Sequence, residues 1–142
     1  MKILLRNLSL AYAAGSVGGL INALAVWVLG VLAITGALGV KVAPALTSAF
    51  LYPRLVWGGL WGFLFLLPFF RNSPVLRGIV YSLGPTLVQL FVVFPFMAKK
   101  GMLGLELGAL TPLFVIFFNI IWGIAAAYWL HFVEDRASKW KW

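Results

Sequence analysis

The chain has 142 residues, of which 63% are hydrophobic and 10% are charged, and its eleven basic and three acidic residues give a net charge of +8. Soluble domains carry about 25% charged residues, so a water-soluble fold is excluded because its surface would expose large apolar patches. The aromatic content excludes a disordered chain, and the absence of cysteine excludes a disulfide scaffold and a thiolate metal site. The composition predicts a small integral membrane protein whose single transmembrane domain occupies residues 1–142.

Four apolar segments separated by charged residues have the length of membrane spans. A hydrocarbon core about 30 Å thick is crossed by about 20 residues of α-helix. Barrel strands alternate apolar and polar residues, whereas these segments are apolar on every side, as in VIFFNIIWGIAAAYWL. We therefore expect an all-α integral membrane protein, a four-transmembrane-helix bundle with spans near residues 10–34, 46–70, 78–98 and 111–131.

The distribution of lysine and arginine predicts the orientation of these spans. If both termini face the cytoplasm and Arg54 is left unassigned, the other basic residues divide into a larger cytoplasmic set (Lys2, Arg6, Arg71, Arg77, Arg136, Lys139, Lys141) and a smaller external set (Lys41, Lys99, Lys100). This bias follows the positive-inside rule, so we expect an N-in/C-in topology. Because the basic residues are not gathered on one soluble face, no nucleic-acid partner is expected.

An internal repeat relates the two halves of the chain. A shift of 65 residues aligns RLVWGGLWG (Arg54–Gly62) with NIIWGIAAA (Asn119–Ala127), so that Trp57 and Gly58 coincide with Trp122 and Gly123. The halves 1–72 and 73–142 would then be two helical hairpins in parallel orientation, related by an axis along the membrane normal. Chance similarity between two apolar segments is the alternative explanation.

Each predicted span carries one strongly polar side chain: Asn22, Arg54, Gln89 and Asn119. Polar residues within spans are costly and often mark functional sites. Because no acid lies within the spans, a buried Arg54 would attract an anion such as a lipid phosphate, a carboxylate or a halide. The alternative for the three amides is that they join neighbouring helices by hydrogen bonds.

The depth of Arg54 is open to two interpretations. The repeat aligns it with Asn119, well inside a span. If Pro53 instead begins the second helix, Arg54 extends to the membrane interface.

Pro85 lies within the third predicted span and predicts a bend of that helix near Gln89. The bend is either part of a substrate site or a kink that only serves helix packing.

Small residues at helical spacing predict close helix contacts. Gly15 and Gly19, and likewise Gly58 and Gly62, have the spacing that lets two membrane helices approach each other closely. These glycines are expected to form packing seams within the bundle or between protomers. At the other end of the chain, Trp140 and Trp142 are expected to anchor the terminus at the membrane interface.

Catalytic and metal-binding chemistry have little support. The chain has one histidine, no cysteine and three acids, and these ionisable residues lie near the predicted membrane edges. A metal site needs several such side chains close together. We therefore expect neither an enzyme, nor a metal, nor a cofactor.

The segment LVQLFVVFPFM (Leu87–Met97), followed by FFNIIWG, resembles small uncharacterised bacterial inner-membrane proteins of the YagU type. The resemblance implies a multi-pass helical protein of the bacterial inner (plasma) membrane and no defined activity.

Two functions remain open. The first is a non-catalytic accessory or scaffold subunit that binds membrane lipids or partner helices, as a homo-oligomer or within a larger membrane complex. It is favoured by the aromatic content and by the lack of acids in the spans. The second is a transporter or channel for a small solute, most simply an anion, with a polar site around Arg54.

Overall fold

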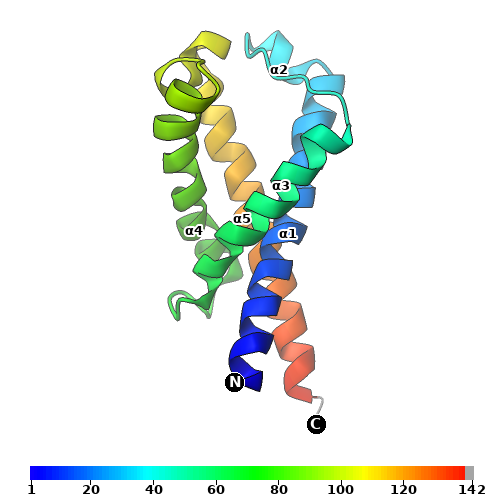
Figure 1. Cartoon of the computed structure of the whole chain (residues 1–142). Coiled ribbons are helices and arrows are strands. Elements are labelled where there is room, and N and C mark those ends of the chain that lie inside the picture. The colour runs from blue at the N-terminus through cyan, green and yellow to red at the C-terminus, as the bar shows by residue number, and fades with distance from the viewer. Residues whose placement is uncertain (140–142) are drawn as a thin grey trace.

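The computed structural model describes residues 1–139, which contain only helices and connecting loops (Figure 1). The all-helical prediction is therefore confirmed for this part of the chain. The elements in order are α1 (Lys2–Val31), α2 (Ile34–Ala37), α3 (Ser48–Trp61), the 3-10 helix η1 (Gly62–Leu66), α4 (Pro74–Val88), the π-helix η2 (Gln89–Met97), the 3-10 helix η3 (Met102–Leu107) and α5 (Thr111–Lys139).

Within the described residues, four helical segments are long and apolar enough to cross a membrane, which confirms the predicted number of spans. They cover Lys2–Val31, Ser48–Leu66, Pro74–Met97 and Thr111–Glu134. The first helix begins at Lys2 rather than near residue 10, because no proline or glycine interrupts the preceding turns. The third begins at Pro74, after the Ser73 hydroxyl accepts a hydrogen bond of 3.3 Å from the Leu76 amide.

The helices form two pairs that are joined along α1 and α5. Helix α1 packs against α3, α4 packs against α5, and α1 packs against α5. Figure 1 shows the start of α1 and the end of α5 at one end of the bundle, here called the terminal end. The opposite end, here called the loop end, carries α2 and η3, and the two pairs diverge toward it (Figure 1).

Glycines bring the backbones of each pair into contact. A Cβ atom on Gly15 would lie 2.1 Å from the Gly58 carbonyl oxygen and 2.7 Å from the Cα of Gly62, so α1 and α3 cross where no larger residue fits. A Cβ on Gly123 would lie 2.1 Å from the Gly78 carbonyl oxygen, where α4 and α5 cross. All four glycines of the predicted seams, including Gly19, thus lie where α1 packs against α3 and the first residue of η1 in the same chain.

Trp122 of α5 connects the two pairs at their centre. The side chain is 3% exposed, and its indole Nε1 donates a hydrogen bond of 3.0 Å to the Gly15 carbonyl oxygen on α1. The ring also packs against Phe65 of η1, with 5.9 Å between the ring centroids. Trp122 therefore joins α1, α5 and the inner part of the second span in one apolar core.

Candidate functional site

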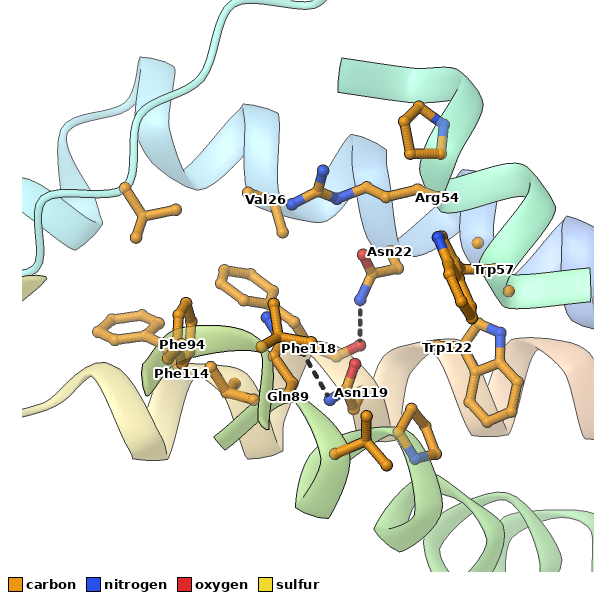
Figure 2. A pocket seen from close by; sticks show the side chains of 18 of the residues that line it. Asn22, Val26, Arg54, Trp57, Gln89, Phe94, Phe114, Phe118, Asn119 and Trp122 are labelled. Atoms are coloured by element: carbon orange, nitrogen blue, oxygen red, sulfur yellow. Dashed lines mark hydrogen bonds between the residues drawn. The ribbon is translucent and has the colours of Figure 1, made fainter. Parts of the chain in front are cut away.

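A cavity of about 510 Å³ lies between the two helix pairs, from the central core toward the loop end. The side chains predicted from the sequence to form a polar site all line it: Asn22, Arg54, Gln89 and Asn119 (Figure 2). They come from α1, α3, η2 and α5, so the fold brings together one polar residue from each span. The rest of the wall is mainly aromatic and aliphatic.

Arg54 lies on the α3 wall of this cavity and is half-buried. Its Nη1 donates a hydrogen bond of 3.2 Å to the Phe50 carbonyl oxygen, and its guanidinium lies 4.0 Å from the centroid of the Phe50 ring. Phe50 is one turn closer to the loop end, so the side chain points in that direction, beside Val26 in Figure 2. No acid is among the described residues that line the cavity, and the positive charge therefore has no counter-charge there.

The position of Arg54 depends on where α3 begins. Thr47 caps this helix, because its hydroxyl accepts a hydrogen bond of 3.3 Å from the Phe50 amide. Pro53 consequently lies inside α3 and does not begin it. A Cβ on Gly19 would lie 2.3 Å from the Arg54 carbonyl oxygen, so the close approach of α1 also holds the Arg54 backbone in place.

The three amides connect the helices around the cavity. The Asn119 amide nitrogen donates to Thr86 Oγ1 at 3.1 Å and to Gln89 Oε1 at 3.3 Å, which links α5 to α4 and η2. The Asn22 amide nitrogen donates to the Phe118 carbonyl oxygen at 2.9 Å, which links α1 to α5. Gln89 lines the cavity, and its side-chain nitrogen makes no hydrogen bond within the described residues.

The third span changes its helical geometry beside the site. Helix α4 continues through Pro85 and becomes the π-helix η2 at Gln89. Proline removes one backbone donor, and π-helical turns are frequent at functional sites. The π-helix begins at Gln89, the residue whose side chain accepts the hydrogen bond from Asn119.

Two loops cover the cavity at the loop end. The Lys41 amide donates a hydrogen bond of 2.8 Å to the Leu107 carbonyl oxygen, which joins the segment after α2 to η3. Gly108 has a φ of 149°, and a Cβ there would lie 2.2 Å from the Gly39 carbonyl oxygen. Only glycine permits both this conformation and this contact.

Arg77 is a buried polar residue, which the sequence analysis only assigned to the cytoplasmic set of basic residues. It is 5% exposed, and its guanidinium donates to the carbonyl oxygens of Phe65 and, at 3.4 Å, of Leu67. The Tyr81 hydroxyl lies 3.1 Å from the same Leu67 oxygen, and both side chains hold the turn between η1 and α4. The signal in the sequence is their four-residue spacing, which places them on one helix face.

A second cavity of about 300 Å³ lies at the terminal end, and its charged lining residues are Arg6, Arg71 and Glu134. It therefore contains charges of both signs. Among residues 1–139, no group of three His, Cys, Asp or Glu side chains is placed to hold a metal ion. The predicted anchors Trp140 and Trp142 lie outside the described residues.

Comparison of the chain with models of protein families, with curated proteins and with solved structures gives no match. The resemblance to YagU-type proteins therefore stays a prediction.

Proposed function

We propose that this protein is a multi-pass protein of the bacterial inner membrane that binds an oxyanion in the cavity between its helix pairs and carries it across the membrane. The observation that carries the proposal is the unneutralised Arg54 on the wall of an intramembrane cavity. A charge in a low-dielectric environment is costly unless it is paired, and the planar guanidinium fork suits the oxygens of phosphate or carboxylate.

The arrangement of the helices supports a carrier. The pairs α1–α3 and α4–α5 meet along α1 and α5 and diverge toward the loop end, with the polar side chains between them (Figures 1 and 2). Carriers built from two similar halves bind their substrate between the halves, near the middle of the membrane. Rocking of one pair against the other would expose the cavity to each side in turn.

The internal repeat and the N-in/C-in topology are part of this proposal. Gly58 and Gly123, which coincide when the chain is shifted by 65 residues, are both crossing points of their helix pairs. Gly58 contacts Gly15, and Gly123 contacts Gly78. The start of α1 and the end of α5 lie at the same end of the bundle, as an N-in/C-in topology requires (Figure 1).

An accessory or scaffold subunit, alone as a homo-oligomer or within a larger complex, is the other function expected from the sequence. The sequence predicted that the pairs Gly15/Gly19 and Gly58/Gly62 form packing seams within the bundle or between protomers, and seams of the second kind would let such a subunit bind partner helices. The structure uses these glycines inside the chain, between α1 and α3. The carrier is therefore the function that we favour.

Anion flux into proteoliposomes tests the proposal. We expect the wild-type protein to move at least one oxyanion from a panel of inorganic phosphate, butyrate and dodecyl phosphate faster than empty vesicles do. Arg54→Gln should lower that flux at least tenfold, because it removes the only cation on the cavity wall among the described residues. Arg54→Lys, which keeps the charge but loses the fork, should retain part of it.

The matched control is Arg71→Gln, because Arg71 is exposed and does not line the main cavity. Its flux should equal that of the wild type. If no oxyanion moves faster than through empty vesicles, or if Arg54→Gln and Arg71→Gln behave alike, the proposed function is wrong.

A further inference from the structure

We infer that the ligand of the main cavity is an anionic amphiphile, with a phosphate or carboxylate head on an apolar chain, and that it enters sideways from the bilayer between α3 and η2. This inference rests on the proposed anion-binding function and specifies the class of its substrate. It depends on which sides of the cavity are closed, which side is open, and how polar and apolar groups are distributed on the wall.

The two ends of the cavity are closed by the protein. At the loop end, the Lys41–Leu107 hydrogen bond and the contact of Gly108 with Gly39 join the loops above the cavity. Toward the terminal end, Trp122 fills the centre of the bundle, and a Cβ on Gly18 would lie 2.5 Å from its carbonyl oxygen. Protein atoms therefore lie across both ends of the cavity.

The side between α3 and η2 is open. Among the described elements, α3 packs mainly on α1 and α4 packs mainly on α5, whereas α3 has no extensive packing against α4 or η2. The second span approaches α4 at Gly84, where a Cβ would lie 3.2 Å from the Trp61 ring and 3.0 Å from the Leu64 side chain. Toward the loop end they diverge (Figure 1).

Residues beside this opening line the cavity and are exposed. Trp57 of α3 is 59% exposed, and Met97 of η2 is 69% exposed. Val88, the last residue of α4, also lines the cavity and is exposed. These side chains give the opening an apolar rim on two membrane-spanning segments, so in a membrane the opening would connect the cavity to the hydrocarbon core rather than to water.

The wall of the cavity has an amphiphilic character that matches such a ligand. The polar side chains gather around Asn22, Arg54 and Asn119, and the rings of Phe94 and Phe114 lie to one side of them (Figure 2). Any anionic group loses water against this wall, which is costly, but only an amphiphile also has an apolar chain that can pack against the apolar part of the wall. An amphiphile places its head at Arg54 while its chain stays in the bilayer and passes through the opening.

Binding to the full-length protein in nanodiscs of an uncharged glycolipid tests the inference. The probe is radiolabelled dodecyl phosphate, with inorganic phosphate and dodecyl maltoside as unlabelled competitors. We expect saturable binding of dodecyl phosphate that neither competitor displaces, since one lacks the chain and the other lacks the charge. Arg54→Gln should weaken this binding at least tenfold, while size-exclusion chromatography shows the wild-type elution volume.

The lateral route is tested by a second pair of variants. Val88→Trp places a large ring in the opening and should weaken binding of dodecyl phosphate at least tenfold. Val92→Trp is the matched control, because Val92 is exposed on η2 but does not line the cavity, and its binding should equal that of the wild type.

The outcomes separate this inference from the proposed function. If inorganic phosphate displaces dodecyl phosphate at similar concentration, the anion site stands and the amphiphile is overturned. If dodecyl maltoside displaces it, the site recognises the chain alone and both proposals fail. If Val88→Trp binds as Val92→Trp does, the lateral route is overturned. If dodecyl phosphate does not bind the wild-type protein saturably, the amphiphile is overturned, and the flux of inorganic phosphate and butyrate into proteoliposomes then decides whether the proposed function stands.

Discussion

Replacing Gly15 by alanine is expected to lower the free energy of unfolding by about 3 kcal/mol, because the added methyl group has no space. Its Cβ would lie 2.1 Å from the Gly58 carbonyl oxygen and 2.7 Å from the Cα of Gly62. Both neighbours are backbone atoms within helices, so no side-chain rotation relieves the contact. Helices α1 and α3 must move apart, and the expected loss is measured by chemical unfolding in mixed micelles.

The matched control is Gly36→Ala in α2, where a Cβ would meet no atom within 4 Å. Gly36 is exposed, and alanine favours helix over glycine, so this variant should be as stable as the wild type or slightly more stable. Equal stability of the Gly15 and Gly36 variants would contradict the close crossing of α1 and α3.

Truncation of Trp122 to alanine is expected to have a still larger effect, a loss of about 4 kcal/mol in the free energy of unfolding. The substitution removes a buried ring that packs on Phe65, together with its hydrogen bond to the Gly15 carbonyl oxygen. It also opens the closed end of the cavity. We expect the thermal unfolding midpoint in detergent to fall sharply.

Two other substitutions divide this effect into its parts. Trp122→Phe keeps an aromatic ring and loses the hydrogen bond, which is worth about 1 kcal/mol, so it should be much milder. Trp57→Ala removes a tryptophan that is 59% exposed, and its stability should be close to that of the wild type. If Trp57→Ala and Trp122→Ala were equally stable, Trp122 would not be the centre of the fold.

The number of spans could be predicted from the sequence because the bilayer imposes a length and an apolar composition on each crossing helix. Their exact limits could not, because caps and loops set them. The second membrane helix begins directly after Thr47 and not at Pro53. The first membrane helix extends to Lys2, beyond the apolar segment. The first difference arises from the side-chain cap of Thr47, and the second from early turns that contain no proline or glycine; hydropathy is sensitive to neither.

The candidate site could be predicted in part. Asn22, Gln89 and Asn119 stand out because each is an amide within an apolar span, and the structure places them on one cavity with Arg54. The direction of the Arg54 side chain could not be predicted, since it depends on the start of α3 and on the approach of Gly19. The gap between α3 and η2 also arises only from tertiary packing.

Arg77 shows the limit of a charge count. Positive residues near span ends predict orientation, and Arg77 does lie near the turn between η1 and α4. Its guanidinium is nevertheless buried against backbone carbonyl oxygens, where it stabilises that turn. A basic residue at a span boundary can therefore be structural as well as topological.

The central claim is that an anion pairs with Arg54 inside the cavity, and a solid-state NMR distance measurement tests it most directly. The protein carries ¹⁵N-labelled arginine and is placed in a glycolipid bilayer without phosphorus, so that added dodecyl phosphate is the only source of ³¹P. We predict that ³¹P dephases a guanidinium ¹⁵N signal that is missing from Arg54→Gln. The absence of dephasing, or identical dephasing in the wild type and in Arg54→Gln, would contradict the account.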